Sequence, residues 1–295
     1  MAALLAAWAA VAGAGPARAH GGPCARGACP AAAPAPARRS LTLLVVGDSL
    51  GEDLEYGLAD ILPPADRVHL VEAAVGSSGL DEPQYYDWPV HLALDLVRDR
   101  PDVVVVLIGA NDTLSFYQDG RYAAFGGALW RRDYGGRVAR MMAEATGAKA
   151  RVLWVGLPVM APWSVLANRN IETLNALYAA QARAHCGVSY LSTWRLFQGP
   201  RGGFTPALRA PDGQILTVRD PDGVHIAPAA GDELVATAVL AALDRTWGFH
   251  LCPAGGDPWR RLAAAACRIG ARSRGTLAAG RGGRGRAGSG GRKRA

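Results

Sequence analysis

Five short apolar segments, separated by polar and glycine-containing stretches, dominate the pattern of the chain from residue 40 onward. The first, LTLLVVGDS, starts at Leu41 and is a continuous apolar run that ends in a glycine turn. Such runs are typical of strands that are buried on both faces of a sheet. The other four predicted strands cover Arg67–Val75, Val103–Ile108, Ala150–Val159 and Gly187–Ser192.

Segments with helical character lie between these strands. They cover Val90–Arg98, Tyr134–Thr146, Val165–His185 and Ala229–Trp247. Strands that alternate with helices indicate a parallel sheet with helices on both faces. We therefore predict an α/β fold, a flavodoxin-like three-layer αβα sandwich with a central parallel five-stranded sheet, in one domain from residue 40 to residue 252. No G-x-G-x-x-G follows a strand, which argues against a dinucleotide site.

The N-terminus differs from this domain in composition. Residues 1–19 hold an apolar stretch of about a dozen residues, too short to span a bilayer, and end in Ala17-Arg18-Ala19, a pattern that resembles a signal-peptidase site. The segment lacks the usual Lys or Arg near its start, and a disordered Ala-rich leader is the alternative. We predict a signal peptide, and hence an exported protein that is periplasmic or secreted, followed by a Pro/Ala-rich linker over residues 20–39.

The C-terminus is basic and rich in Gly and Arg. From Arg260 onward the chain has eleven Arg or Lys and no acidic residue, so that the net charge of +7 leaves −4 on residues 1–259. Such a composition predicts a disordered tail over residues 253–295. The tail could contact an anionic envelope polymer or a membrane. Because no aromatic side chain for stacking follows Arg260, we expect no nucleic-acid partner.

The cysteines and histidines do not indicate a metal site. The five cysteines contain no C-x-x-C pair, and the six histidines do not cluster with them at zinc spacing. In an oxidising compartment Cys186 and Cys252 could form a disulfide, although the sequence leaves the pairing open. We expect neither a metal nor a cofactor.

The stretch Gly47–Gly51 reads GDSLG and matches two hydrolase signatures. As G-x-S-x-G it fits the nucleophile elbow of the α/β-hydrolases, but that fold places several strands before its serine. Here little more than a linker precedes the strand that carries Ser49, which excludes the elbow. Two further polar motifs follow predicted strands, GSSGL at 76–80 and GAND at 109–112, and a third, DGVH at 222–225, precedes the last predicted helix. In open parallel sheets, ligands bind beyond the carboxyl ends of the strands.

These four motifs, in this order and over the whole domain, resemble those of the SGNH or GDSL hydrolase family. The phrases SSGLDEPQYYDWP and WVGLPVM further resemble an exported bacterial subgroup of that family whose function is unknown. The resemblance implies an SGNH hydrolase-like fold and a serine esterase that needs no cofactor.

The chemistry of the residues leads to the same roles. A serine hydroxyl becomes a nucleophile when a neighbouring base takes its proton, and His225 is the candidate base. Asp222 would hold the imidazole in the useful tautomer and stabilise its charged form. Asp220 is the alternative partner for His225. We therefore predict a catalytic triad of Ser49, His225 and Asp222.

A tetrahedral intermediate also needs donors for its oxyanion. The resemblance assigns these to the backbone N–H of Ser49, a backbone N–H in the second motif, and the side-chain amide of Asn111. In the second motif we prefer Gly79, with Gly76 as the alternative. We expect Asp48 and Asp112 to orient these loops, while Asn168 and Asn170 could either face the pocket or lie on a helix surface.

Aromatic residues suggest where a substrate binds. Tyr86 and Trp88, together with Tyr85, could stack on sugar rings or belong to the core. The long connection Thr113–Asp133 is also rich in aromatic residues, which could form a substrate-binding lip or pack over the sheet edge. They are Phe116, Tyr117, Tyr122, Phe125 and Trp130.

We therefore predict an exported serine esterase that removes small acyl groups, O-acetyl above all, from a carbohydrate or envelope polymer through an acyl-Ser49 intermediate. One alternative is a periplasmic polysaccharide O-acetyltransferase that uses the same triad. The other is a non-catalytic glycan-binding protein.

Overall fold

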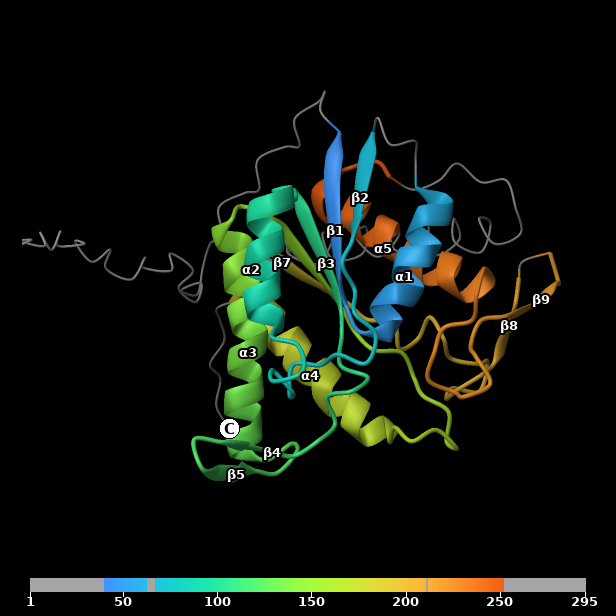
Figure 1. Ribbon diagram of the computed structural model, residues 1–295. Helices are drawn as coiled ribbons and strands as arrows, with labels where there is room; N and C mark the ends of the chain where they lie inside the picture. The colour runs from blue at the N-terminus through green and yellow to red at the C-terminus, as the bar shows by residue number, and fades with distance from the viewer. Residues whose placement is uncertain (1–39, 63–66, 211, 252–295) are drawn as a thin grey trace, which may run out of the picture.

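A five-stranded parallel sheet forms the centre of the protein, and its strand order is β2-β1-β3-β6-β7 (Figure 1). The computed structural model describes residues 40–62, 67–210 and 212–251. The strands of the sheet are β1 (Leu41–Gly47), β2 (Val68–Glu72), β3 (Val103–Leu107), β6 (Arg151–Val155) and β7 (Val188–Leu191). The predicted fold class is confirmed.

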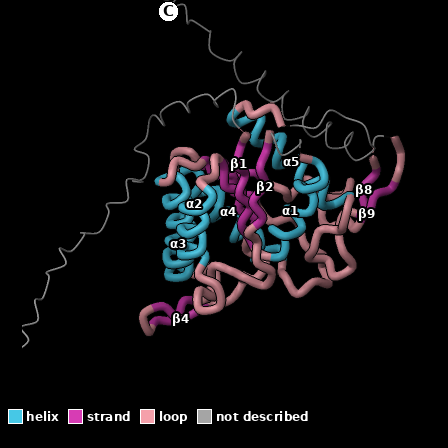
Figure 2. Tube along the Cα trace, turned by 45° about the horizontal axis from the view of Figure 1, so that its top comes forward, coloured by secondary structure: helices cyan, strands magenta, loops and turns pink. Residues whose placement is uncertain are grey.

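Helices cover both faces of the sheet and make the three layers (Figures 1 and 2). On one face α1 (Ser49–Ile61) packs against α5 (Ala230–Trp247). On the other face α3 (Ala128–Gly147) lies between α2 (Trp88–Asp99) and α4 (Asn168–Ala184), and contacts both. The central strands β1, β3 and β6 are almost entirely buried, as expected for a sheet that helices cover on both faces.

The strand β1 lies inside the sheet and its carboxyl end places Ser49. Leu43, Leu44, Val45 and Val46 are completely buried, as expected for a strand covered by helices on both sides. At its last residue, Gly47, an added Cβ would lie 1.9 Å from the carbonyl oxygen of Leu107 in β3. Only glycine therefore allows β1 and β3 to approach so closely just before the serine.

Two small antiparallel hairpins extend from the carboxyl edge of the sheet. One consists of β4 (Phe116–Gln118) and β5 (Arg121–Ala123), and the other of β8 (Ala207–Arg209) and β9 (Ile215–Thr217). The first lies near α3 and the second lies on the side of α1 and α5 (Figure 1). The sequence did not predict either hairpin, because three-residue strands are too short for a clear alternation of polar and apolar positions.

Sequence analysis also missed α1, although its pattern is clear in the structure. Leu50, Leu54, Leu58 and Ile61 recur at helical spacing and are buried, and Asp48 caps the first turn. The first six residues of α3 were interpreted as part of a loop. Conversely, the predicted strands that begin at Arg67 and Ala150 extend past β2 and β6, because the residues directly after both strands are also mostly apolar.

Several predictions concern residues outside the described ranges. These are the signal peptide over residues 1–19, the linker over 20–39 and the basic tail over 253–295. Cys186 is disulfide-bonded, and the other four cysteines lie outside the described residues. Among the described helices, none combines the length and apolar character that crossing a membrane requires.

Candidate active site

Ser49 is the first residue of α1, directly after β1. The preceding residue, Asp48, has extended backbone angles and its Oδ1 accepts a hydrogen bond from the Leu50 N–H at 3.0 Å. The first N–H groups of a helix have no partner within the helix, and no acceptor among the described residues receives the N–H of Ser49. The helix dipole also favours negative charge at this end. The strand-to-helix junction therefore places the Ser49 hydroxyl beside a backbone N–H that is available to a ligand, as the predicted nucleophile and oxyanion donor require.

Asp48 joins this junction to the loop after β3. Its Oδ2 accepts hydrogen bonds from the N–H groups of Gly109 and Ala110, both at 2.8 Å. The side chain is completely buried. Burial raises the pKa of Asp48 to about 7, although the backbone N–H groups oppose the shift. The expectation that Asp48 orients the loops is confirmed.

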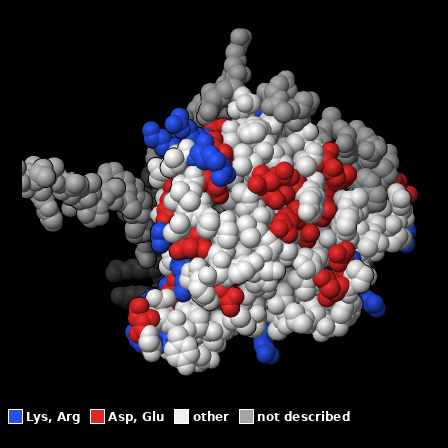
Figure 3. All heavy atoms as spheres, in the orientation of Figure 1, with Lys and Arg blue, Asp and Glu red and all other residues white. Residues whose placement is uncertain are grey.

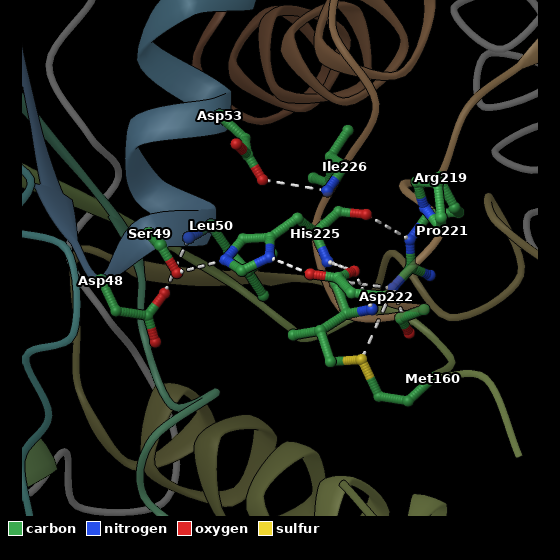
Figure 4. Close-up of polar contacts among 12 residues, drawn as sticks. Asp48, Ser49, Leu50, Asp53, Met160, Arg219, Pro221, Asp222, His225 and Ile226 are labelled. Carbon is green, nitrogen blue, oxygen red and sulfur yellow. Dashed lines mark hydrogen bonds and ion pairs between the residues drawn. The ribbon is translucent and has the colours of Figure 1, made fainter. Parts of the chain in front are cut away.

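Ser49, His225 and Asp222 form a continuous hydrogen-bonded chain (Figure 4). His225 Nε2 lies 2.9 Å from Ser49 Oγ, and His225 Nδ1 lies 2.5 Å from Asp222 Oδ2. The other carboxylate oxygen, Asp222 Oδ1, accepts the N–H groups of Val224 and His225 at 2.8 and 3.0 Å. This geometry fits a general base that is oriented by a carboxylate.

The charges of the pair are consistent with these roles. Burial disfavours the imidazolium of His225, but the hydrogen bond and charge of Asp222 outweigh burial and raise the pKa of His225. Burial likewise opposes the charge of Asp222, but the bonds from His225 and the backbone lower its pKa. The structure also distinguishes between the two candidate partners of His225, because the imidazole is hydrogen-bonded to the carboxylate of Asp222 and not to that of Asp220.

Arg219, which sequence analysis missed, supports the loop that carries the Asp-His pair. Its side chain is 1% exposed. Its guanidinium donates to the carbonyl oxygens of Val159 at 2.5 Å, His225 at 3.1 Å and Val224 at 2.8 Å. Its centre also lies 5.4 and 5.2 Å from the rings of Phe197 and Phe204. Burial lowers the pKa of Arg219 to about 10, so that it stays charged at neutral pH.

A second tether connects the same loop to α1. Asp53, one turn after Ser49, accepts the N–H of Ile226 at 2.9 Å (Figure 4). Burial raises the pKa of Asp53 to about 6. Because the buried Arg219 and the half-buried Asp53 both hold this loop, His225 is positioned beside Ser49 before any substrate binds. Sequence analysis could have found these two residues from their distance to the motifs. Asp53 lies in the first turns after GDSL, and Arg219 lies three residues before the first residue of DGVH.

The second motif presents Gly79 and not Gly76. The N–H of Gly76 donates to Glu52 Oε1 at 2.8 Å, and it is therefore already paired. No acceptor among the described residues receives the N–H of Gly79. An added Cβ at Gly79 would lie 2.3 Å from Asp112 Oδ1, so that only glycine fits this close approach. These contacts favour the preferred residue over its alternative.

Asn111 lies beside the same turn. Its Nδ2 donates one hydrogen to the carbonyl oxygen of Ser78 at 2.8 Å, and the amide carries a second hydrogen for a ligand. Ser78 is itself held, because Trp88 Nε1 donates to its Oγ at 3.0 Å. The three predicted donors thus belong to loops that side-chain hydrogen bonds connect to one another.

Hydrogen bonds to Asp112 and Asp81 connect the loop of Gly79 to the loop of Asn111. Asp112 Oδ1 accepts the N–H groups of Leu80 and Asp81 at 2.6 and 3.0 Å, and Asp112 Oδ2 accepts the hydroxyl of Tyr134 at 2.6 Å. Asp81 Oδ2 in turn accepts the N–H of Leu114 at 3.3 Å. The expectation that Asp112 orients its loop is confirmed.

The carboxyl groups of Asp81 and Asp112 also influence each other's ionisation. Asp81 Oδ1 is buried, and no N–H or O–H of the described residues bonds to it, so that a proton on Asp81 would have Asp112 as its partner. Burial first, and then the charge of Asp112, raises the pKa of Asp81 to about 8. Two adjacent buried carboxylates cannot both ionise cheaply, so the pair holds one proton at neutral pH.

We predict that Asp81→Asn flattens the dependence of stability on pH. A carboxyl whose pKa rises from 3.8 to about 8 on folding contributes stability that is present below about pH 4 and is lost as the pH rises to 8. The amide keeps a donor toward Asp112 at every pH. Thermal unfolding between pH 4 and 9 should show a shallower decline in the variant than in the wild type. Asp81→Ala, the control, should be destabilised throughout; identical slopes for wild type and Asp81→Asn would refute the shared proton.

Tyr86 and Trp88 were expected either to stack on a sugar or to belong to the core, and both contact other side chains of the protein. Trp88 is completely buried, so it cannot stack on a sugar; it packs in the core and supports Ser78. Tyr86 is half-buried and stacks on His91, with ring centroids 4.0 Å apart. Asn168 bonds through its side-chain amide to both backbone groups of Met160, and therefore braces a loop. Trp163, which sequence analysis missed, is exposed and donates to the carbonyl of Pro221 beside Asp222.

Comparisons with known proteins agree with this fold. A family model described as a protein of unknown function (DUF459) matches residues 42–242. A solved structure from Bacteroides fragilis, described as that of an acylhydrolase, is 19% identical to this chain and has a TM-score of 0.50. The match covers 72% of this chain and 91% of the other. A GDSL-like lipase from Bacteroides thetaiotaomicron is 18% identical, with a TM-score of 0.49, over 69% and 88%.

A third structure, the acetyl xylan esterase AlAXEase, is 15% identical, with a TM-score of 0.49, over 69% of this chain and 100% of the other. A comparison with curated proteins finds no significant match. The match to the family model covers more than half of the sequence, and the fold is that of the SGNH hydrolases. The chain therefore belongs to the family described as proteins of unknown function (DUF459).

Proposed function

We propose that this protein is an exported serine esterase that removes small acyl groups, acetyl above all, from a carbohydrate polymer. The observation that carries the proposal is the chain of hydrogen bonds from Asp222 through His225 to Ser49. The predicted leader over residues 1–19 supports export. The cavity described in the next subsection, which is lined by amide, hydroxyl, carboxylate and aromatic side chains, supports a carbohydrate.

The reaction follows from these positions. His225 Nε2 takes the proton of Ser49 Oγ as that oxygen attacks the ester carbonyl carbon. The N–H groups of Ser49 and Gly79 and the amide of Asn111 stabilise the oxyanion. When the carbon–oxygen bond of the ester breaks, the leaving alkoxide receives the proton from His225. Water, deprotonated by the same imidazole, then hydrolyses the acyl-Ser49 ester and restores the enzyme.

The exposure of the site favours hydrolysis over acyl transfer. The side chains of His225 and Asp222 are 37% and 48% exposed, so that water has access to the group that activates it. A transferase has to keep water away from its acyl-enzyme. The hydrogen-bonded triad likewise argues against a protein that only binds glycans.

Turnover of p-nitrophenyl acetate by the full chain tests the proposal. We expect a burst of nitrophenol, release of free acetate, and a mass increase of one acetyl group on the peptide that contains Ser49. An added oligosaccharide acceptor should leave the yield of free acetate unchanged. Acetate that appears on the oligosaccharide instead would establish a transferase, and the absence of any acetyl-Ser49 would contradict the esterase.

We also predict that Asn111→Ala lowers kcat by about two to three orders of magnitude, because one oxyanion donor is typically worth that much. The expected change in KM is small, since the donor acts on charge that develops in the transition state. Steady-state kinetics on p-nitrophenyl acetate would measure both values. Thermal unfolding serves as the control for an intact fold, and an unchanged kcat would remove Asn111 from the oxyanion hole.

A further inference from the structure

A cavity of about 320 Å³ lies between the segments that continue the two oxyanion loops. One wall is formed by Asp81, Glu82, Pro83 and Gln84, and the other by the five residues from Leu114 to Gln118; Arg137 of α3 also lines it. Asp81 follows Gly79 by two residues and Leu114 follows Asn111 by three. Since an extended residue spans about 3.5 Å, the walls begin within about 7 and 11 Å of the two donors.

Hydrogen bonds hold these walls in place. Arg137 donates to the carbonyl of Leu80 at 2.5 Å and to Gln118 Oε1 at 3.0 Å, and its guanidinium lies 4.5 Å from the centre of the Phe116 ring. Trp130 Nε1 donates to the carbonyl of Leu114 at 3.0 Å. The cavity is therefore preformed, which lowers the entropic cost of binding.

The aromatic residues of the 113–133 connection divide into two groups. Phe116, Phe125 and Trp130 pack against one another, with Trp130 completely buried. Tyr117 and Tyr122 face solvent from the β4–β5 hairpin, with 73% and 58% of their surface exposed. Their ring centroids are 5.3 Å apart. Both interpretations of this segment thus hold for different residues: one group packs, and the other is free to contact a ligand.

The lining suits the hydroxyl groups of a sugar. Glu82 offers acceptors, Gln84 and Gln118 offer amides, and Ser115 adds a hydroxyl, while the ring of Tyr117 supplies a flat apolar surface. The charge of Arg137 is directed at Leu80 and Gln118, whereas the carboxylate of Glu82 is exposed. Acidic side chains also gather over α1, whose first residue is Ser49 (Figure 3). These charges oppose an anionic sugar.

We propose that this cavity binds one neutral pyranose unit of the polymer whose ester reaches Ser49, with Tyr117 stacked on the sugar ring. The inference rests on the proposed function for the identity of the polymer, but the binding itself does not require turnover. The volume is at the lower end of small-ligand sites and suits a single ring. A polymer would then extend from the oxyanion loops toward the β4–β5 hairpin.

Binding by the full-length Ser49→Ala variant tests this proposal, with xylohexaose, cellohexaose and chitohexaose as neutral probes and hexagalacturonate as the anionic one. We expect calorimetry to detect at least one neutral hexasaccharide and not hexagalacturonate. Adding Tyr117→Ala should weaken that binding about tenfold, because a stacked aromatic ring contributes on that order. Adding Tyr56→Ala, the matched control, removes an equally exposed tyrosine from α1 and should have no effect.

The proposal is overturned if none of the neutral hexasaccharides binds, if hexagalacturonate binds as well as they do, or if the Tyr117 and Tyr56 substitutions have equal effects. Circular dichroism and thermal unfolding would verify that the variants are folded. The p-nitrophenyl acetate assay of the wild type reports on the esterase separately. Ester cleavage without glycan binding would therefore reject the subsite alone, and glycan binding without ester cleavage would reject the esterase alone.

Discussion

Replacing Ser49 by alanine is expected to reduce kcat on p-nitrophenyl acetate by about 10⁴-fold or more. The substitution removes the atom that forms the acyl-enzyme, and His225 then has no hydroxyl to deprotonate. The residual rate would come from the oxyanion donors and from substrate binding, which remain. Since Ser49 is the first residue of α1 and Asp48 still caps that helix, the thermal stability should change little.

The double variant Ser49→Ala/His225→Ala provides the strongest control for this prediction. Residues that act as one unit have strongly non-additive effects on kcat. Because His225 Nε2 lies 2.9 Å from Ser49 Oγ, we expect the double variant to be no slower than the slower single variant. Additive losses, or wild-type activity in Ser49→Ala, would show that Ser49 and His225 do not form one nucleophilic pair.

Replacing Arg219 by methionine is expected to cost about 3 kcal/mol or more in the free energy of unfolding. Methionine has a similar length and no donors, so the carbonyl groups of Val159 and Val224 would lose their donor, whereas the carbonyl of His225 would keep the N–H of Asp220. Each unpaired buried polar group costs about 1–3 kcal/mol. Urea-induced unfolding at neutral pH would measure the change.

Arg219→Lys separates the effect on the fold from the effect on catalysis. Lysine keeps the positive charge but lacks the planar fork that reaches several carbonyls at once. We expect this variant to recover part of the stability and to retain a lowered kcat with a nearly unchanged KM, because the loop that carries His225 loses its exact placement. If both Arg219 variants matched the wild type in stability and kcat, Arg219 would have no positioning role.

The sheet could be predicted from the sequence because its signal is local. Each central strand is a run of apolar residues, such as Val103–Leu107, that must be buried on both faces. The helix α1 carries an equally regular pattern, but it begins inside the GDSL motif, and the prediction treated that motif as a turn. The ends of β2 and β6 were wrong because the apolar sequence continues into the loops after them.

The candidate residues of the triad could be named from their motifs, but the sequence left an alternative open for two of the predicted site residues. Asp220 and Asp222 are both within reach of His225 along the chain, and only the structure shows that the hydrogen bond to Nδ1 comes from Asp222. Gly76 and Gly79 are both glycines of the second motif, and the residue type alone does not show which of them offers its N–H to a ligand. They differ in space, since Glu52 binds the N–H of Gly76 while Asp112 packs against Gly79.

For Trp88, the sequence could not decide between a binding site and the core. A tryptophan near the second motif is compatible with sugar stacking, and its complete burial depends on how α2 packs against the sheet. Tyr117, in contrast, was one of five aromatic residues in a long connection, and the hairpin geometry decides that its ring faces solvent. Aromatic residues carry both a large apolar surface and a polar group, so sequence alone does not assign them to a core or to a binding site.

The sequence by itself determined the fold class, the order of the strands along the chain and the identity of Ser49, Asn111, Asp222 and His225, because these depend on local apolar runs and on motifs of adjacent residues. Tertiary structure decided which side chains hold them. Asp48, Asp81, Asp112 and Arg219 act across separations of up to about 60 residues, and such contacts arise only when the parallel strands bring their carboxyl ends to one edge of the sheet.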